Sequence, residues 1–426
     1  MNYLIAILMP ILLLLGFPFK TILLGTLLLG LTLFIPGFDL TMLVQQVLTG
    51  MKPFALLCIP MFILTASIVT AGESAKRLIK VLRAFIGHIP GGLPITCNAA
   101  CTVFGSVSGS TQATVAAIGG TMRPMLLKAG YSDSFAMGLI INSSDIANMI
   151  PPSIGFVVYG VATSTSVGRL FLSGVIPGLI IFAAFSLYSF FYSKAKDVGI
   201  APKASRKERF QSIRDGLLLV GFPVIVIGGI YSGYMSPTEA SAATAAYALI
   251  LELLVYRSLT PKDIPAILIN TGMVTTVVWM LIGAGQAFSW VLSFLQVPQQ
   301  FIPQILGADP SPLRVIITIN IAYLIACMFV DPIVAIYILS PIFGPYVDQA
   351  GIDKVFLGCL VTLQVAIGSA TPPFGCDIFT AQVIFKRPYI EVIRKIGPFI
   401  AILLAVNVLL IVFPGIALWL PNLAFR

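Results

Sequence analysis

A pattern of Ala-Gly followed by Pro-Pro occurs twice in this chain, once in each half. Ala129-Gly130 is followed by Pro151-Pro152, and Ala350-Gly351 is followed by Pro372-Pro373. The two copies lie 221 residues apart, from Gly130 to Gly351. A half-length repeat interrupted by Gly, Ser and Pro is typical of secondary transporters built from two related halves. Such folds hold their substrates where the membrane helices are broken, so the breaks are the first places to search for a site.

The composition indicates a membrane protein. Of the 426 residues, 58% are hydrophobic and only 10% are charged, whereas a soluble domain carries about 25% charged residues. Apolar runs of bilayer length recur, and about ten to twelve spanning helices are expected, together with shorter re-entrant segments. The N-terminus becomes apolar at once without a basic region, which predicts a retained first helix. The fold class is therefore an all-α polytopic membrane protein.

The net charge of +9 has two interpretations. A basic protein can bind nucleic acid, but the sequence has no basic groove with interleaved aromatic residues. The densest basic cluster instead runs from Lys194 to Arg214, between the two halves. Short basic loops orient membrane proteins by the positive-inside rule, which favours a cytoplasmic connection here.

The cysteines and the single histidine argue against a metal centre or an enzyme. Six cysteines lie in or beside apolar segments, and we interpret them as small buried residues. Cys97 and Cys101 are four residues apart and share a helix face, but a metal site needs more ligands. His88 is the only histidine and lies outside the broken segments. A membrane-embedded enzyme would need a nucleophile with its base, or a metal cluster.

The repeat divides the chain into two halves. Residues 1–195 form the first repeat and residues 216–426 the second, joined by a basic connecting loop over 196–215. Basic residues alternate with apolar ones at helical spacing over 75–88, which predicts an amphipathic arm helix at the membrane surface. An odd number of crossings in each half would make the two repeats inverted relative to one another.

The first break is the Gly/Ser-rich stretch from Gly105 to Gln112, within a predicted re-entrant hairpin over 93–118. The apolar runs on either side are each too short to cross the membrane. Backbone carbonyls and Ser hydroxyls supply the neutral oxygens that hard cations prefer. The alternative is a helix-packing motif of small residues.

The second break runs from Asn142 to Ser153 within a predicted broken helix over 135–165. Proline frees carbonyl groups from the helix ladder. Asp145 is an ionisable group at membrane depth, which makes it a functional candidate by default. The alternative is a loop at the membrane surface.

The second half repeats this pair. A hairpin over 315–340 has Asp331-Pro332 at its tip, and a broken helix over 356–385 contains the stretch from Gly368 to Asp377. One cation site in each pair, with the substrate between them, is the natural inference. Arg123 follows the first hairpin, where it can pair with a substrate carboxylate, pair with Asp145 or act as a snorkelling anchor.

Several motifs resemble the large membrane subunit of TRAP (tripartite ATP-independent periplasmic) transporters. The resemblance runs from about Gly16 to the C-terminus. It rests on Pro60-Met61-Phe62-Ile63-Leu64, the stretch Phe104–Ser110 with Ala116–Gly119, Ile150-Pro151-Pro152-Ser153, Gly229–Gly233 with Ser236–Ala240, and Thr371-Pro372-Pro373-Phe374-Gly375.

The resemblance implies a Na⁺-driven symporter with an elevator mechanism in a bacterial inner membrane. It also implies a small four-helix membrane subunit and a periplasmic binding protein that delivers organic acid anions. Cation binding is expected at the hairpin tips and breaks, at Ser106, Gly109, Ser143, Ser144, Val330, Gly368, Ser369 and Thr371. Substrate binding is expected at Ser108, Ser110, Arg123, Asp145, Ser153 and Asp331.

The stretch from Asn142 to Asn148 departs from the family pattern, in which many members carry small residues there. A polar pocket with a carboxylate suits a polyhydroxylated substrate, so a sugar acid such as sialic acid is favoured and a C4-dicarboxylate comes next. The main rival is a stand-alone Na⁺/dicarboxylate symporter of related fold, which would work without a binding protein. A purely structural scaffold subunit would not need four polar breaks at membrane depth.

Overall fold

The computed structural model describes residues 8–9, 11–12, 15–17, 19–35, 37–198, 202–307 and 310–425, and these contain helices and no strand. The first half holds α2 (Phe19–Phe34), α3 (Leu40–Gly50), α4 (Cys58–Ala71), α5 (Ser74–Ile86), α6 (Gly92–Ser108), α7 (Thr111–Lys128), α8 (Asp133–Asp145), α9 (Ile154–Thr163) and α10 (Val167–Lys196). Short 3₁₀ segments, η1 (Phe54–Leu57) and η2 (Ile146–Asn148), precede α4 and follow α8.

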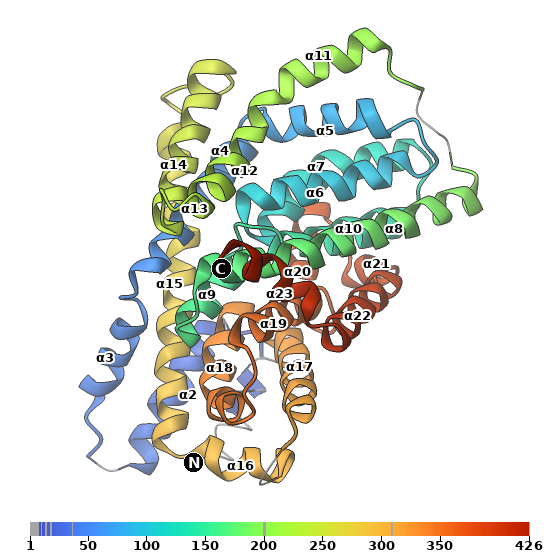
Figure 1. Ribbon diagram of the computed structural model, residues 1–426. Helices are drawn as coiled ribbons and strands as arrows, with labels where there is room; N and C mark the ends of the chain where they lie inside the picture. The colour runs from blue at the N-terminus through green and yellow to red at the C-terminus, as the bar shows by residue number, and fades with distance from the viewer. Residues whose placement is uncertain are drawn as a thin grey trace.

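The second half begins with a helical run of α11 (Arg206–Gly216), η3 (Leu217–Val220), α12 (Gly221–Pro223), η4 (Val224–Gly228) and α13 (Gly229–Tyr231). It continues with α14 (Pro237–Ile250), η5 (Leu251–Val255), α15 (Ile264–Phe294), α16 (Val297–Leu306), α17 (Pro312–Phe329), α18 (Pro332–Gln349), α19 (Lys354–Ser369), α20 (Cys376–Phe385), α21 (Tyr389–Ile393), α22 (Gly397–Val412) and α23 (Gly415–Ala424). Figure 1 shows α15 extending along one side of the molecule.

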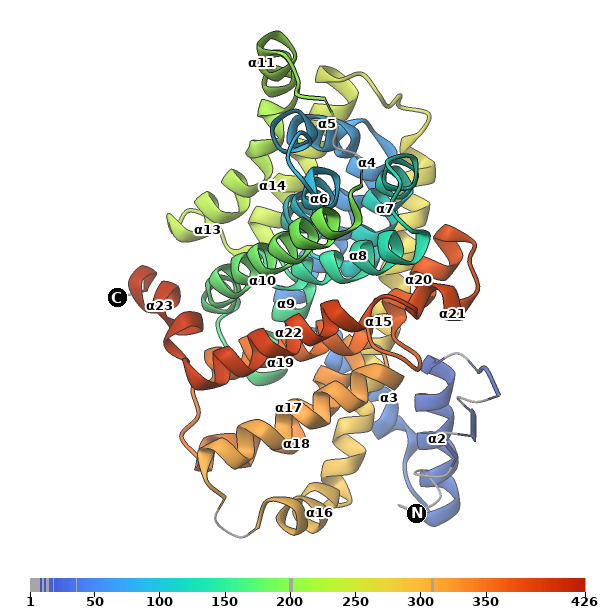
Figure 2. The same cartoon turned by 90° about the vertical axis from the view of Figure 1, so that its right-hand side faces the viewer.

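The helix boundaries keep the 221-residue spacing of the sequence. α7 and α18 hold this offset at both ends, from Thr111–Lys128 to Pro332–Gln349. The paired helices α6–α7 and α17–α18 are longer than the stretches 93–118 and 315–340, because each pair continues beyond its apolar run. In Figure 2 the first pair lies above and the second below, with α19 and α22 between them.

The number of long spans is smaller than the sequence predicts. Among the residues that the structure describes, six helices are long and apolar enough to cross a membrane by length and composition, or seven if the bent pair α22–α23 counts as one span. The shortfall arises because breaks divide the remaining apolar sequence into shorter helices. These include Thr21–Leu33, Ile154–Thr163, Lys354–Ser369 and Cys376–Phe385.

The segment expected to be a basic connecting loop over 196–215 becomes a helix from Arg206 onward. Ser205 and Glu208 form a capping box, with the Ser205 amide 2.7 Å from the Glu208 carboxylate and the Glu208 amide 3.2 Å from the Ser205 hydroxyl. Such reciprocal bonds satisfy the free amides that begin a helix. The Arg209 guanidinium also lies 5.6 Å from the ring centre of Phe85 on α5, which holds α11 against the arm helix.

A buried carboxylate of the second half also holds the start of the arm helix α5. Glu252 in η5 is fully buried and accepts hydrogen bonds from the amides of Glu73 (3.1 Å) and Ser74 (3.0 Å), and from the Ser258 hydroxyl. A carboxylate at a helix N-terminus satisfies free amides and complements the helix dipole. Glu252 therefore fixes the start of α5, which packs beside α6.

Glu252→Gln is expected to lower the free energy of unfolding by about 1–3 kcal/mol, because an amide removes a buried charge-assisted acceptor. Thermal unfolding of the purified protein measures this. Glu239→Gln is the matched control, since Glu239 accepts at the exposed start of α14 in a capping box that tolerates Gln. Equal shifts of the unfolding midpoint in the two variants would rule out a special role for Glu252.

The apolar interior separates into two clusters. The smaller cluster joins α2, α3 and α15 through residues such as Leu27, Leu43 and Phe288, and Val334 of α18 also belongs to it. The larger cluster includes α4, both hairpins and the broken helices. The α2–α3–α15 unit thus has its own packed core and meets the α17–α18 hairpin along α15.

Candidate functional site

The first hairpin turns at Gly109 and Ser110, between α6 and α7. Gly109 has a φ of +63°, the left-handed conformation that glycine adopts at little cost. The Ser110 hydroxyl accepts from the Ala113 amide at 3.4 Å and begins α7. The Gly109 carbonyl accepts from the Ile154 amide at 3.1 Å. The tip is therefore bonded to the first turn of α9, beyond the Pro151-Pro152 break.

The second hairpin has a related arrangement with a charged tip. Asp331 caps α18 by accepting from the Ile333 amide at 2.9 Å. Met328, near the end of α17, accepts from the Phe374 amide at 3.1 Å, which joins this hairpin to the Thr371–Gly375 break. Each hairpin is thus connected through its backbone to the broken helix of its own half.

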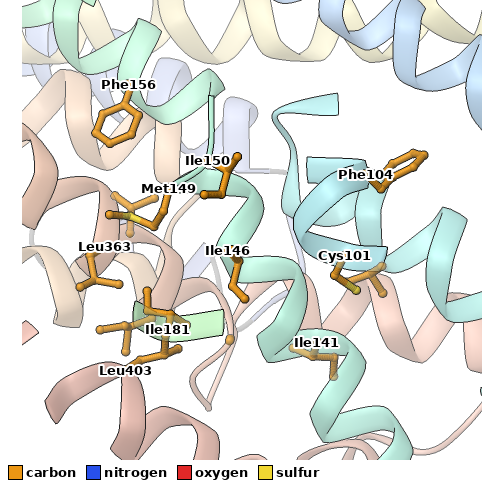
Figure 3. Packing of buried hydrophobic residues seen from close by; sticks show 14 of the residues in the cluster. Cys101, Phe104, Ile141, Ile146, Met149, Ile150, Phe156, Ile181, Leu363 and Leu403 are labelled. Carbon is orange, nitrogen blue, oxygen red and sulfur yellow. The ribbon is translucent and has the colours of Figure 1, made fainter. Parts of the chain in front are cut away.

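Apolar packing holds the first break in place. Figure 3 shows Ile146, Met149 and Ile150 at this break, with Phe156, Leu363, Ile181 and Leu403 on one side and Cys101, Phe104 and Ile141 on the other. All of these side chains are buried. Gly105 of α6 also lies so close to Ala147 that an added Cβ would sit 2.6 Å from the Ala147 Cα. The break is therefore a packed structural element.

A cavity of about 770 Å³ opens between the two hairpin tips and the helices α4 and α15. Its volume is in the range of small-molecule sites. Asp331 is the only charged side chain among the described residues that line it. The polar lining consists of Ser67, Thr70, Ser108, Ser110, Thr111, Gln112, Asn148, Asn270 and Asp331.

Three of the six predicted substrate residues line this cavity. Ser108, Ser110 and Asp331 all do so, and they bring the two hairpin tips to one site. Ser153 is fully buried and caps α9 by accepting from the Phe156 amide at 3.3 Å, although its neighbour Ile154 reaches the cavity.

Arg123 lies away from the cavity. Its guanidinium makes two bonds of 2.7 Å to the Asp133 carboxylate and one of 3.3 Å to the Phe385 carbonyl. Arg387 also donates to Asp133, at 2.9 Å. Arg123 therefore joins the end of α7 to the start of α8 and to the end of α20, and its role in substrate binding stays a prediction.

Asp145 is also outside the cavity and faces a second carboxylate. It is 1% exposed, and its side chain interacts directly with Asp377 of α20. Asp377 is fully buried and accepts from the hydroxyls of Thr111 (2.7 Å) and Ser369 (2.8 Å). The end of α8 is thus turned toward α20, and contact of Asp145 with substrate stays a prediction.

The predicted cation ligands lie at the tips and breaks, where most of their hydroxyls bond within the same helix. Ser106 donates to the Val103 carbonyl, Ser144 to Ile140 and Thr371 to Ile367. Ser369 donates to the Ala366 carbonyl as well as to Asp377. Each hydroxyl keeps an oxygen lone pair for an ion.

The remaining four predicted ligands offer backbone or free oxygens. Ser143 is buried and its hydroxyl has no partner. Gly109 and Val330 end α6 and α17 at the tips, and Gly368 packs against Cys327. No group of three or more His, Cys, Asp or Glu side chains in the described ranges is arranged to hold a metal ion. The neutral oxygens of this set suit a weakly bound Na⁺.

Sequence reasoning missed the residues on the far wall of the cavity. Ser67 and Thr70 on α4, and Asn270 on α15, come from helices without Gly/Pro breaks. A polar side chain in an otherwise apolar span indicates a functional position, and Asn270 is such a residue. Asp377 also falls within the fourth break but is absent from the predicted site residues, as is Thr111, its hydroxyl donor.

Comparisons with known proteins agree with one another. Residues 6–416 match the family described as the tripartite ATP-independent periplasmic transporter, DctM component. The ectoine/5-hydroxyectoine TRAP transporter large permease of Ruegeria pomeroyi is 54% identical, over 98% of both chains. The ectoine TRAP transporter large permease of Halomonas elongata is 53% identical, over 97% of both.

More distant similarity extends to other substrates and to a solved structure. The sialic acid TRAP transporter large permease of Vibrio cholerae is 35% identical over 89% of both chains. The crystal structure of the Alcanivorax borkumensis YdaH transporter matches with a TM-score of 0.62 at 14% identity, covering 88% of this chain and 87% of that one. At that identity the structural match supports the fold alone.

Proposed function

The chain belongs to the TRAP transporter large permease family, and from that premise we propose that it imports an ectoine-like zwitterion together with Na⁺. As a member it is a multi-pass inner-membrane transporter subunit, not an enzyme, and it moves a solute delivered by a binding protein. The observation that carries the substrate proposal is the identity of 54% and 53% to two ectoine permeases over nearly full length.

The substrate favoured by the sequence, a sugar acid such as sialic acid, gives way to ectoine on two grounds. The sialic acid permease is only 35% identical. A sugar acid is also favoured only if Asp145 lies in the substrate pocket, whereas Asp145 faces Asp377. A C4-dicarboxylate fits the cavity poorly, because its two negative charges would face Asp331 with no cationic side chain in the described lining.

The charge of the cavity suits a zwitterion. Ectoine carries a cationic cyclic amidine and a carboxylate on one small ring. Asp331 can pair with the amidinium through planar, charge-assisted hydrogen bonds. Gln112 and Asn270 supply amide donors for the carboxylate. The apolar wall from α4 and α15 covers the ring.

An elevator mechanism is supported by the position of the cavity. It lies between two hairpin tips on one side and α4 with α15 on the other. In this proposal the hairpins and broken helices form two inverted repeats with re-entrant tips, and they move as a unit against a scaffold that includes α2, α3 and α15. The separate apolar core of α2, α3 and α15 supports that division. The substrate then crosses the membrane with its site intact.

Na⁺ coupling is proposed at the tips and breaks, through the eight ligands predicted there. The tip–break hydrogen bonds at Gly109 and Met328 hold those oxygens close together in each half. Coupling requires that Na⁺ and substrate each raise the affinity for the other. Binding of Na⁺ at the hairpin tips would orient Ser110 and Asp331 for the substrate.

Two protein partners complete the proposed system. A small four-helix membrane subunit would cover apolar surface of the scaffold, where Leu28, Leu33, Val44 and Leu48 on α2 and α3 are exposed. A periplasmic binding protein would deliver ectoine to the open cavity. Membrane lipids cover the remaining apolar surface.

Uptake of labelled ectoine into proteoliposomes tests the proposal. The chain is reconstituted with its small subunit, and uptake is measured with and without the cognate binding protein, in a gradient of Na⁺ or of choline. We expect uptake only with both Na⁺ and the binding protein. Full-rate uptake of free ectoine would support the stand-alone symporter, and preference for sialic acid or a C4-dicarboxylate would refute the substrate assignment.

A further inference from the structure

A second cavity, of about 220 Å³, lies where the end of α9 meets α17, α18 and the start of α19. None of the described residues lines both this cavity and the one between the hairpin tips. Its buried part is lined by three aromatic side chains, Tyr159, Tyr323 and Phe343. Lys354 is the only charged side chain among the described residues around it. A cavity of about 150 Å³ holds a benzene molecule, so this one has room for a single substituted ring.

The first half of the chain has a matching junction, and the chain's own side chains occupy it. α9 packs against α18 and α19, and in the same way α20 packs against α7 and α8. The Arg123 guanidinium makes two bonds of 2.7 Å to the Asp133 carboxylate and lies 5.2 Å from the ring centre of Phe385, the last residue of α20. A Cβ added at Gly119 would lie 2.8 Å from that ring. A charged group and an aromatic ring therefore fill the junction of α20 with α7 and α8.

The corresponding residues around the cavity leave that space open. Gly344 stands 221 residues after Arg123, and Lys354 stands 221 residues after Asp133. α9 ends at Thr163, whereas α20 ends at a phenylalanine. The junction of α9 with α18 and α19 thus lacks both the guanidinium and the ring, and it has a base where the other junction has an acid.

We propose that this cavity is a binding site for a small aromatic carboxylate, which places its ring among the three aromatic side chains and its carboxylate on Lys354. A concave, largely apolar site with a single charged group is typical of sites for small organic molecules. The ligand supplies a ring and a charge of the kind that the chain itself supplies at the junction with α20. The sign of that charge is reversed, because a lysine replaces the aspartate.

The existing ion pair of Lys354 leaves it able to bind such a ligand. Its ammonium lies 2.9 Å from the Asp348 carboxylate, and the two side chains are 42% and 62% exposed. Exposed pairs of this kind contribute little to stability. An ammonium group also has three hydrogens to donate, so Lys354 can bind a second carboxylate beside Asp348.

A ligand at this site connects the two halves of the chain, because α9 belongs to the first half and α18 and α19 to the second. Since it binds the folded protein, it raises the unfolding temperature by mass action. The site therefore has a readout that does not involve transport. The inference depends neither on ectoine as the substrate nor on Na⁺ coupling.

Equilibrium dialysis of labelled benzoate against the purified full-length chain tests the site, with benzamide as the neutral probe of the same shape. We expect one saturable equivalent of benzoate and binding of benzamide at least tenfold weaker. Lys354→Met should weaken benzoate roughly tenfold or more, because it removes a charge-assisted donor, and it should leave benzamide unchanged. Lys80→Met is the matched control, since Lys80 forms a comparable exposed pair with Asp215, at 3.1 Å, outside the cavity.

A second variant fills the cavity. Gly344→Arg combined with Lys354→Asp places the charged pair of the first half at the equivalent positions of the second. Nothing lies within 4 Å of a Cβ built at Gly344, so the new side chain has room to enter the cavity. We expect this variant to lose benzoate binding and to unfold at a higher temperature without ligand, because filled cavities stabilise proteins.

Three results would overturn the inference. The first is the absence of saturable benzoate binding to the unsubstituted chain. The second is equal affinity for benzoate and benzamide, which would show that the site does not recognise a carboxylate. The third is unchanged benzoate binding in both the Lys354→Met and the cavity-filling variant, which would place the bound benzoate elsewhere on the protein.

Discussion

Asp331→Asn is expected to reduce the apparent affinity for ectoine roughly 30-fold or more while the protein stays folded. Loss of one partner of a desolvated charge pair costs about 2 kcal/mol or more, and 1.4 kcal/mol corresponds to about tenfold in affinity. Asp331 is the one charged group in the described lining of the cavity. Without it the amidinium would enter a site that offers only neutral partners.

The choice of asparagine separates binding from folding. Asp331 also caps α18 through the Ile333 amide, and asparagine caps helices about as well as aspartate. Alanine would remove the cap together with the charge. Asp353→Asn is the matched control, because Asp353 caps α19 at the Val355 and Phe356 amides, outside the cavity lining.

Ectoine uptake over a range of concentrations, at saturating Na⁺, measures the effect. Saturating Na⁺ prevents a loss of Na⁺ affinity at neighbouring Val330 from appearing as a loss of substrate affinity. The Asp353→Asn protein should transport at nearly the unsubstituted rate. An unchanged half-saturation concentration for Asp331→Asn would show that Asp331 acts as a helix cap and does not contact substrate.

The positions of the breaks were predictable from sequence because their causes are local. Gly109 permits a left-handed turn, and Pro151 and Pro372 interrupt the helix ladder in both copies. The arm helix also follows from periodicity, and α5 covers Ser74–Ile86. The start of α11 carried a local signal too, the Ser205–Glu208 capping box, which the high charge of the segment obscured.

The partners of charged residues were not predictable because they depend on distant packing. Arg123 and Asp133 are ten residues apart, but Arg387 joins them from the other half. Glu252 binds the amides of residues 73 and 74, which lie 179 and 178 residues away in the sequence. The sequence predicts Asp145 to be an acid at membrane depth, but only the fold brings Asp377 against it. The sequence identifies such groups because burying a charged side chain in an apolar segment is unfavourable. The structure then identifies the residues that they face.

The second large effect concerns the contact between the first hairpin and its break. Gly105→Ala is expected to destabilise the protein by about 1–3 kcal/mol, the usual cost of overpacking, and to abolish most uptake. The new methyl group would lie 2.6 Å from the Ala147 Cα and 2.7 Å from its Cβ. Since the nearer atom is backbone, α6 must move away from η2.

That displacement would reach the site through the chain. Gly105 lies one helical turn before Gly109, whose carbonyl bonds the Ile154 amide. A shift of α6 therefore separates the tip from the break and spreads the oxygens proposed to bind Na⁺. The second half makes the same kind of contact with the glycine on the opposite partner, where Gly368 of α19 packs against Cys327 of α17.

Gly120→Ala provides the matched control on the other arm of the same hairpin. Nothing lies within 4 Å of a Cβ built at Gly120, so this change should stabilise α7 by about 0.5–1 kcal/mol through helix propensity alone.

Thermal unfolding and Na⁺-driven uptake are measured for both variants. If Gly105→Ala matches Gly120→Ala in both measurements, the contact between α6 and η2 is not what holds the first tip. If it unfolds earlier but transports normally, the tip–break distance does not limit transport. Only joint loss of stability and uptake supports a hairpin held in register by this glycine.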